Sequence, residues 1–222
     1  MMCDIQGDPY AAQRQKMVSS QLRRRGIRDE RVLAAMERVP RHEFVEEHFR
    51  FRAYDDDPLP IGEGQTVSQP FMVAYMLEAL EVTPEHHVLE VGTGTGYQAA
   101  LLADLARDVI TIERHGPLAD AARRNLDRLG YRNVTVITGD GTQGWSEAAP
   151  YDRIIVAAAA PRVPPSQFEQ LAEGGKLIVP VGSTELQEVL LVEKKDGRPL
   201  TRQLEGCRFV PLIGTEGFSP PR

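Results

Sequence analysis

The chain has 222 residues, of which 41% are hydrophobic, so it can bury a substantial core without disulfides. Its formal net charge of -6 argues against a dedicated nucleic-acid binder, and no run of about 18 apolar residues predicts a membrane helix. Cys3 and Cys207 are the only cysteines and the start of the chain has no apolar segment, so we expect a reduced, cytoplasmic, monomeric protein.

The first part of the chain is predicted to be helical. Apolar residues recur at helical spacing over residues 9 to about 25 and 29 to about 37, and Gly26 separates the two runs. The basic run Arg23-Arg24-Arg25 is interpreted as a solvated helical face, because acidic residues follow it closely. Asp55-Asp56-Asp57 is interpreted as a turn, because no histidine or cysteine accompanies it at metal-ligand spacing, and we expect no metal site.

A glycine-rich segment then leads into a third helix. The segment reads Ile61-Gly-Glu-Gly-Gln-Thr-Val-Ser-Gln-Pro70. We expect the helix over residues 69 to about 80, with Ser68 as its N-cap and Pro70 in its first turn, because serine is a favoured N-cap and proline fits the first turn.

Strands and helices alternate after this helix, which predicts a parallel sheet with helices on both faces. In the last third, turns replace the helices between strands, so we expect partly antiparallel edge strands there. The predicted strands are 88–91, 109–113, 134–138, 153–157, 175–182, 188–193 and 206–212, and the helices between the first of them are about 97–106 and 117–129.

A three-glycine turn follows the first of these strands. Gly92, Gly94 and Gly96 permit dihedral angles that side chains forbid, and the next helix directs unpaired N–H groups at the turn. The spacing G-x-G-x-G differs from the dinucleotide pattern G-x-G-x-x-G. Glu90, two residues before Gly92, would repel a pyrophosphate and attract a cofactor with an amino group. The turn, including Thr93, therefore predicts a site for S-adenosylmethionine.

Acidic residues at the ends of the next two strands suit other parts of this cofactor. Ligands of open parallel sheets bind outside the carboxyl ends of the strands. Glu113, which ends the second strand, is placed to hold the ribose hydroxyls. Asp140, followed by Gly141 after the third strand, is placed to accept a hydrogen bond from the adenine amino group.

The methyl acceptor is indicated by the segment after the fourth strand. Amide- or amine-directed methyltransferases often carry an Asn/Asp-Pro-Pro-aromatic run there, whereas this chain has Ala157-Ala-Ala-Ala-Pro161, which offers no base. A carboxylate, with a pKa of about 3.3 to 4.3, is already ionised at neutral pH and needs none. The segment therefore favours carboxyl methylation.

Several segments together resemble the protein-L-isoaspartate O-methyltransferase family, over about residues 17 to 218. Gly64-Gln-Thr-Val-Ser-Gln-Pro70 is the most specific of them, because many methyltransferases share the glycine turn. The other segments are Arg38-Val-Pro-Arg-His-Glu-Phe-Val45, residues 89–98, Gly139-Asp-Gly141 with Gly144-Trp145, Ala158-Ala-Ala-Pro161 and Pro180-Val-Gly182.

The resemblance implies roles for the residues around Ser68. Ser68 corresponds to the active-site serine of the family, and Gln65, Thr66 and Val67 would line the cofactor and substrate cleft. The Ser68 hydroxyl would orient the substrate carboxylate rather than attack it, because methyl transfer from a sulfonium is an in-line displacement that depends on alignment.

The resemblance also implies the substrate. It would be the free α-carboxylate of an L-isoaspartyl residue, and also of a D-aspartyl residue, in damaged proteins and peptides. Esterification makes a good leaving group, so the neighbouring amide nitrogen closes a succinimide, whose hydrolysis returns some normal aspartate. Val181 and Gly182 are our candidates for contacts to the peptide backbone.

We therefore expect an α/β fold of the Rossmann-like class I S-adenosylmethionine-dependent methyltransferases. It would have a mostly parallel sheet of about seven strands with helices on both faces, plus N-terminal helices. A single domain is expected, with residues 1–69 as a helical and loop appendage, 70–212 as the core and 213–222 as a tail without an assigned role.

Two alternatives remain open from the sequence. One is a carboxyl methyltransferase dedicated to a single peptide or protein partner, which would turn over generic isoaspartyl peptides poorly. The other is a cofactor-binding module without catalysis, which would show a degraded site, whereas Ser68, Glu90, Glu113 and Asp140 are all present.

Overall fold

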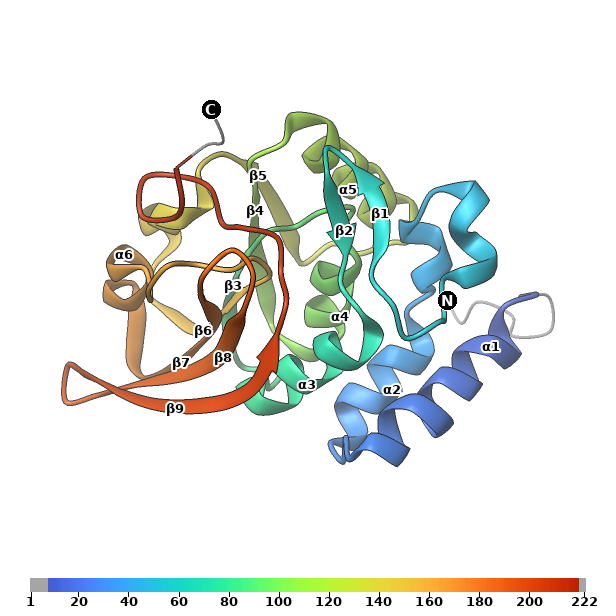
Figure 1. Cartoon of the computed structure of the whole chain (residues 1–222), viewed down its shortest axis with the longest axis horizontal. Helices are drawn as coiled ribbons and strands as arrows, with labels where there is room; N and C mark the ends of the chain where they lie inside the picture. Colours follow the sequence, from blue (N-terminus) through green and yellow to red (C-terminus); the bar gives the residue numbers. More distant parts are fainter. Residues whose placement is uncertain (1–7, 220–222) are drawn as a thin grey trace.

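The computed structural model describes residues 8–219, in which seven strands form one sheet in the order β5-β4-β3-β6-β7-β8-β9 (Figure 1). Strands β3 to β7 are parallel, and β8 and β9 are antiparallel to their neighbours. A separate antiparallel hairpin joins β1 to β2. The strands are β1 (Leu59–Gly62), β2 (Gln65–Val67), β3 (His87–Val91), β4 (Asp108–Glu113), β5 (Val134–Thr138), β6 (Tyr151–Val156), β7 (Leu171–Gly182), β8 (Gln187–Lys195) and β9 (Arg198–Cys207).

The helical segments agree with the predicted ones to within a few residues, and the predicted break at Gly26 has a φ of 107°. A short helix, α6, was not predicted. The α-helices are α1 (Ala11–Lys16), α2 (Glu30–Arg38), α3 (Pro70–Leu80), α4 (Tyr97–Leu105), α5 (Gly116–Arg128) and α6 (Pro165–Glu169). A π-helical segment, η2 (Met17–Leu22), continues α1, and the short 3-10 segments are η3 (Arg23–Arg25), η4 (Arg41–Phe44), η5 (Glu47–Arg52), η6 (Gly141–Gln143) and η7 (Ser146–Ala148).

Alternate residues of the central strands point into two cores, one on each face of the sheet. Val88 packs into the core that α2 to α5 cover, whereas Leu89 and Val91 pack into the other. Phe168 of α6 and Leu212 close this second core. Both faces of the parallel strands are therefore buried, which explains their continuous apolar sequence. The predicted α/β fold, with a mostly parallel sheet of about seven strands, is confirmed.

The predicted last strand, 206–212, is wrong. The strand is β9, which pairs with β8 and ends at Cys207. Most β9 side chains are exposed, so the strand lacks the apolar run that the prediction relied on. The apolar residues from Phe209 to Leu212 instead cross the carboxyl end of the sheet, where Ala159 bonds to the main chain of Val210 and Leu212.

The predicted N-cap of the third helix is also wrong, because α3 begins at Pro70 after Gln69, which caps it without a side-chain bond. The free N–H at this end is satisfied from elsewhere: the Phe71 N–H donates to Asp56 Oδ1 at 3.0 Å. The Gln69 amide donates to the main-chain and side-chain oxygens of Asp56, both at 2.8 Å, and Arg25 pairs with the same carboxylate. Asp56 therefore holds the start of α3, and the Ser68 hydroxyl is not used as a cap.

Replacing Asp56 with Ala should lower the free energy of unfolding by about 1 to 2 kcal/mol, because the start of α3 loses its acceptor. Chemical unfolding of the two proteins measures this. Asp55→Ala is the matched control: its carboxylate is half-exposed and makes one surface ion pair, so we expect at most a few tenths of a kcal/mol. Equal losses in both variants would contradict the capping role.

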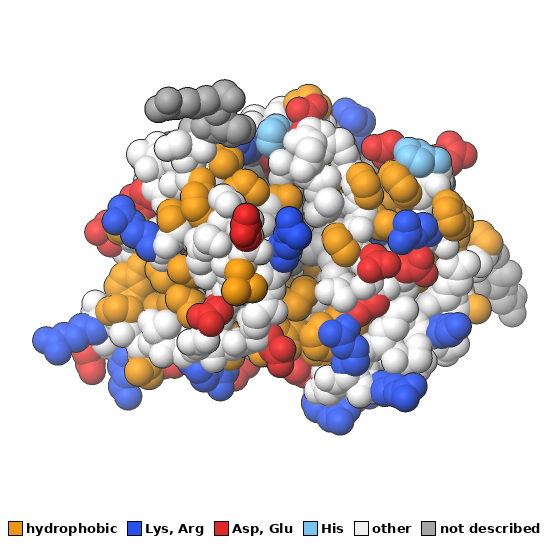
Figure 2. Space-filling model, viewed as in Figure 1, with side chains coloured by type: hydrophobic (Ala, Val, Ile, Leu, Met, Phe, Trp, Pro, Cys, Tyr) orange, Lys and Arg blue, Asp and Glu red, His pale blue; other side chains and the backbone are white. Residues whose placement is uncertain are grey.

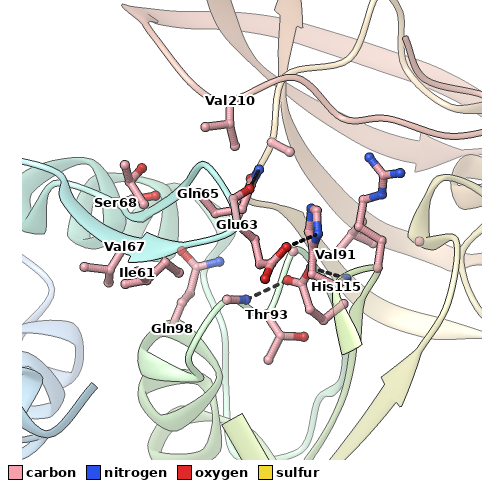
Figure 3. Close-up of a pocket in the computed structure, with 18 of the residues that line it drawn as sticks. Ile61, Glu63, Gln65, Val67, Ser68, Val91, Thr93, Gln98, His115 and Val210 are labelled. Carbon is pink, nitrogen blue, oxygen red and sulfur yellow. Dashed lines mark hydrogen bonds and ion pairs between the residues drawn. The ribbon is translucent and has the colours of Figure 1, made fainter. Parts of the chain in front are cut away.

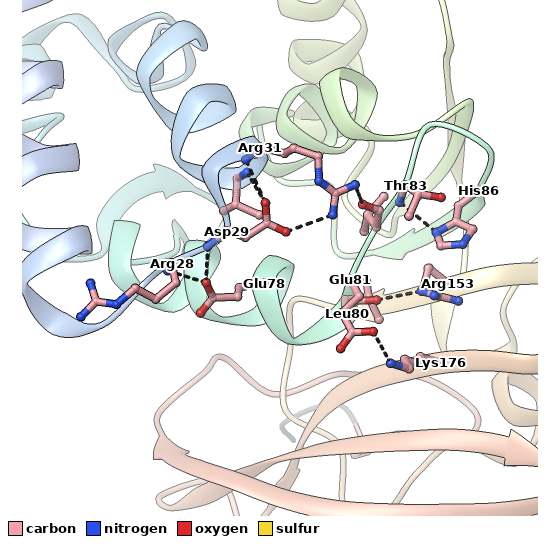
Figure 4. A network of polar contacts seen from close by, with 12 residues as sticks. Arg28, Asp29, Arg31, Glu78, Leu80, Glu81, Thr83, His86, Arg153 and Lys176 are labelled. Atoms are coloured by element: carbon pink, nitrogen blue, oxygen red, sulfur yellow. Dashed lines mark hydrogen bonds and ion pairs between the residues drawn. The ribbon is translucent and has the colours of Figure 1, made fainter.

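Polar contacts tie the first helices to α3 (Figure 4). Glu78 Oε1 accepts from the main-chain N–H groups of Arg28 and Asp29, both at 2.6 Å. Arg31 Nη1 donates to the Val82 carbonyl at 2.9 Å, just beyond the end of α3. These contacts fix the N-terminal helices beside the sheet. The division of one domain at residues 69 and 212 stays a prediction.

Acidic and basic side chains are interspersed over the face shown in Figure 2. Within residues 8–219 no helix is both long and apolar enough for a membrane crossing. In the same part of the chain, no three His, Cys, Asp or Glu side chains are grouped as metal ligands. The Cys207 thiol is half-buried and free, and Cys3 lies outside the described residues.

Candidate active site

The glycine turn lies where the strand order reverses, because β4 and β6 flank β3 on its two sides. Gly92, Gly94 and Gly96 have φ values of 94°, 56° and 98°, which side chains rarely adopt. A Cβ atom on Gly94 would also lie 2.9 Å from Ile61 Cδ1. The turn thus needs glycine for both its conformation and its close approach to the β1-β2 hairpin.

A cavity of about 370 Å³ opens above this turn, at the carboxyl ends of the strands (Figure 3). The β1-β2 hairpin and Ser68 form one wall, and residues 210–213 form another. Most of the predicted site residues line it: Gln65, Thr66, Val67, Ser68, Gly92, Thr93, Gly94, Glu113 and Gly141. Gly96, Glu90, Asp140, Val181 and Gly182 are not among the lining residues.

Glu113 occupies the end of β4 and is buried, with 5% of the residue exposed. Its Oε2 accepts from the Gly94 N–H and its Oε1 from the His115 N–H, both at 2.9 Å. These bonds hold the carboxylate in one orientation at the cavity wall, and each oxygen keeps a second lone pair. Glu113 is therefore placed to accept hydrogen bonds from a ligand.

Glu90 lies behind the turn and is fully buried. Burial raises the pKa of Glu90 to about 8, although the hydrogen bond from Thr111 and the nearby amide of Gln98 favour its charged form. Thr111 donates to Oε2 at 2.5 Å and contacts the Thr93 hydroxyl at 2.6 Å. Among the described residues, Glu90 Oε1 and Gln98 Nε2 have no hydrogen-bond partner of acceptable geometry. An acceptor and a donor are thus left buried side by side under the turn, which a ligand with both an ammonium and a carboxylate group would satisfy.

The raised pKa of Glu90 predicts a pH-dependent stability. The folded carboxyl titrates near 8 and the unfolded one near 4.5, so the folded protein binds more protons between these values. Glu90 therefore makes the free energy of unfolding fall as pH rises, by up to about 1.4 kcal/mol per pH unit. Glu90→Gln, which does not titrate, should show a weaker decline from pH 6 to pH 8 in urea unfolding. Parallel pH profiles for variant and wild type would contradict this assignment.

The Asp140 side chain is occupied by the end of the chain. Its Oδ1 accepts from the Thr142 N–H and hydroxyl at 2.9 and 2.7 Å, and its Oδ2 accepts from the Thr215 N–H and hydroxyl at 2.9 and 3.1 Å. Burial raises the pKa of Asp140, but these bonds outweigh it and lower the pKa below its ordinary value. Both oxygens are saturated, so Asp140 in this conformation anchors the tail, and its expected contact with an adenine amino group stays a prediction. Glu216 adds a second anchor through Ser166, whose N–H and hydroxyl donate to it at 3.0 and 2.5 Å.

Val181 and Gly182 are explained by strand pairing. Both pair with β8, and the Gly182 N–H donates to the Ala160 carbonyl at 3.1 Å. A Cβ atom on Gly182 would lie 2.4 Å from the Leu186 carbonyl oxygen. Their proposed contact with a peptide stays a prediction that the geometry does not favour.

A second cavity of about 330 Å³ adjoins the first. The two share Thr66, Ser68, Ala157 and Val210, so Ser68 lies at their boundary. The charged residues in the lining of the second cavity are Arg25, Arg208 and Glu205. Sequence reasoning missed this cavity, because residues 205–210 reach Ser68 only through the fold.

The first cavity meets the requirements of S-adenosylmethionine. Its lining contains the oriented Glu113 carboxylate and the Gln98 amide, and the Gln98 donor and the nearby buried Glu90 acceptor are both unpaired. The lining holds two carboxylates, of Glu63 and Glu113, and one guanidinium, of Arg114, and this negative balance suits a cofactor that carries a sulfonium. When bound, this cofactor supplies an activated methyl group.

The fold and the site together define a class I S-adenosylmethionine-dependent methyltransferase. A Plasmodium falciparum structure described as a protein-L-isoaspartate O-methyltransferase in complex with S-adenosyl-L-homocysteine is 29% identical, with a TM-score of 0.78 over 90% of this chain and 98% of that chain. Another structure named protein-L-isoaspartate O-methyltransferase is 33% identical, with a TM-score of 0.84 over 92% of this chain and 67% of that chain.

The family is shown by sequence. The family model described as protein-L-isoaspartate(D-aspartate) O-methyltransferase matches residues 12–217. The protein-L-isoaspartate O-methyltransferase of Koribacter versatilis is 58% identical over 213 residues, which cover 96% of both chains. The chain belongs to the protein-L-isoaspartate(D-aspartate) O-methyltransferase family, and the predicted family, enzyme class and cofactor are confirmed.

Proposed function

We propose that this chain methylates the free α-carboxylate of L-isoaspartyl residues, and of D-aspartyl residues, in damaged proteins and peptides. The position of Ser68 carries this proposal. Its hydroxyl makes no capping bond and lies between a cavity that suits the cofactor and a cavity with two arginines. An anionic peptide group entering the second cavity would meet the methyl donor at Ser68.

Different residues of the first cavity would bind different parts of the cofactor. The glycine turn at Gly92 to Gly96, with Thr93, would hold the methionine portion over Glu90, and Glu113 would hold the ribose. Gly141 lines the cavity where the adenine would lie, and it must be glycine because a Cβ atom there would lie 2.6 Å from Val91 Cγ1. Asp140 would either release Thr215 and accept a hydrogen bond from the adenine amino group, or stay bonded to Thr215 and keep residues 210–213 in place as the wall beside the adenine.

The second cavity would hold the substrate peptide. The Arg25 Cζ lies 3.5 Å from the centroid of the Phe71 ring, and Arg208 follows β9. Arg25 is already paired with Asp56, so Arg208 is the cation that would attract a substrate carboxylate. The second cavity therefore replaces Val181 and Gly182 as the candidate peptide site.

The reaction then needs alignment rather than proton transfer. The substrate carboxylate is ionised at neutral pH, since its pKa is about 3.3 to 4.3. The Ser68 hydroxyl would donate a hydrogen bond to one carboxylate oxygen and so orient the other toward the methyl group that the cofactor supplies. The hairpin wall formed by Gln65, Thr66 and Val67 excludes water from the reacting atoms.

A methyl-transfer assay tests the function. Purified protein, radiolabelled S-adenosylmethionine and an isoaspartyl peptide should give a labelled ester, while the same peptide with normal aspartate should give almost none. Equal labelling of both peptides, or none, would contradict the proposal. Poor turnover of several unrelated isoaspartyl peptides would favour a dedicated partner instead.

The setting of the enzyme is inferred from the sequence only. We propose that it acts as a monomer in the cytoplasm without nucleic-acid partners, as the composition suggests. Light scattering after size-exclusion chromatography tests the oligomeric state.

A further inference from the structure

Among the described residues, Arg41 has the largest fully buried side chain, and this side chain carries a charge. It begins η4, inside the segment 38–45 that contributes to the family resemblance but has no role in the mechanism above. Burying a guanidinium is costly unless it is paired and hydrogen-bonded. Within residues 8–219, Arg41 makes two hydrogen bonds, and both go to main-chain carbonyls rather than to a carboxylate. Its Nη1 has no hydrogen-bond partner among the same residues. So costly an arrangement calls for a function.

The two acceptors lie on segments that meet at the active site. Arg41 Nε donates to the Ala53 carbonyl at 2.8 Å, and Nη2 donates to the Ser68 carbonyl at 2.8 Å. Its Cζ lies 4.8 Å from the centroid of the Tyr97 ring, which is a cation–π contact. Tyr97 is the first residue of α4, directly after Gly96. One rigid guanidinium thus touches both the serine segment and the end of the glycine turn.

We propose that Arg41 is a positioning residue that fixes Ser68 relative to the cofactor turn, so that the serine hydroxyl meets the substrate carboxylate beside the methyl group. This inference rests on the proposed function. Ser68 and Tyr97 line the first cavity, whereas Arg41 lies behind them and touches neither ligand directly. The planar fork with fixed donor directions suits this task, and a single ammonium group does not.

Arg41→Lys tests the proposal, because it keeps the charge but cannot reach both carbonyls and the ring together. We expect kcat for isoaspartyl peptide to fall about 30-fold, with peptide KM and the Kd of S-adenosylhomocysteine within about three-fold. In a Ser68→Ala background the same change should lower kcat less than three-fold, because Arg41 acts through Ser68. The same fold-loss in both backgrounds, or no loss in either, would overturn the proposal.

Arg153→Lys is the matched control. Arg153 is a half-buried arginine that also donates to main-chain carbonyls, of Leu80 at 2.7 Å (Figure 4) and of Asp152 at 2.8 Å. It lies near the amino end of β6, whereas the first cavity lies at the carboxyl ends of the strands. Its replacement should lower Tm but leave kcat within about two-fold. A loss of kcat equal to that of Arg41→Lys would mean that any buried arginine has this effect, which would overturn the specific role.

The conformation of Ser68 gives a test that does not need activity. If Arg41 fixes the serine segment, crystal structures of the protein should show one ordered Ser68 conformation in wild type and in Arg153→Lys, and a displaced or disordered one in Arg41→Lys. An unchanged Ser68 in Arg41→Lys would refute the positioning role, whereas failure of the methyl-transfer assay alone would refute only the proposed function.

Discussion

Ser68→Ala should lower kcat on an isoaspartyl peptide about 50-fold while the Kd of S-adenosylhomocysteine changes less than three-fold. A hydrogen bond to a charged group contributes about 1.5 to 3 kcal/mol, and here it acts on alignment of the reacting carboxylate. The hydroxyl makes no cap bond to α3, so its loss should leave the fold intact. Steady-state kinetics and isothermal titration measure the two quantities.

The control for this variant is Ser20→Ala. The Ser20 hydroxyl is exposed and donates to the Lys16 carbonyl at 2.6 Å within the N-terminal helical segment, so the change should leave kcat unaltered. An unchanged kcat in Ser68→Ala would contradict the role given to Ser68. A large loss of cofactor affinity in the same variant would mean that the serine serves the cofactor rather than the substrate.

The cofactor half of the site could be predicted from the sequence because its signals are local. Gly92, Gly94 and Gly96 follow a strand directly, and Glu113 ends the next strand, so the α/β topology alone brings them to one edge of the sheet. The same topology could not predict that Glu90 is fully buried under the turn and does not line the cavity.

The substrate half depends on contacts between distant parts of the chain. Ser68 looks like an N-cap in the sequence, but Asp56 supplies that function from another segment and leaves the serine free. Arg41 reaches the Ser68 carbonyl, and Thr215 reaches Asp140, across 27 and 75 residues of the chain. Hydrophobic periodicity carries no information about such pairs, since each partner is a polar residue in a loop or at a helix end.

The C-terminal segment shows that an apolar run can also be assigned to the wrong structural element. Residues 206–212 have the apolar composition of a strand, yet Val210 to Ile213 form a wall of the cofactor cavity. Their neighbours Thr215 and Glu216 bind Asp140 and Ser166, which keeps that wall closed. An apolar run thus predicts burial correctly but does not distinguish a sheet edge from a segment that covers a site.

Glu113→Gln should raise the Kd of S-adenosylmethionine and S-adenosylhomocysteine about 100-fold. The amide keeps one oxygen, so it can satisfy either the Gly94 or the His115 N–H but no longer both together with the ribose hydroxyls. The loss combines a charge-assisted bond to the ligand with a weaker hold on the glycine turn. At saturating cofactor, kcat should recover to within about three-fold of wild type, because the side chain does not touch the reacting carboxylate.

The ligand itself separates these two contributions. Removing a ribose hydroxyl from S-adenosylhomocysteine should weaken binding to wild type about ten-fold but to Glu113→Gln only about two-fold, because the partner of that hydroxyl is already altered. Asp120→Asn, an exposed acid in α5 that pairs with Arg123, is the control and should bind both ligands like wild type. If the deoxy ligand loses the same affinity in wild type and Glu113→Gln, the carboxylate orders the turn only, and the ribose is held by other groups.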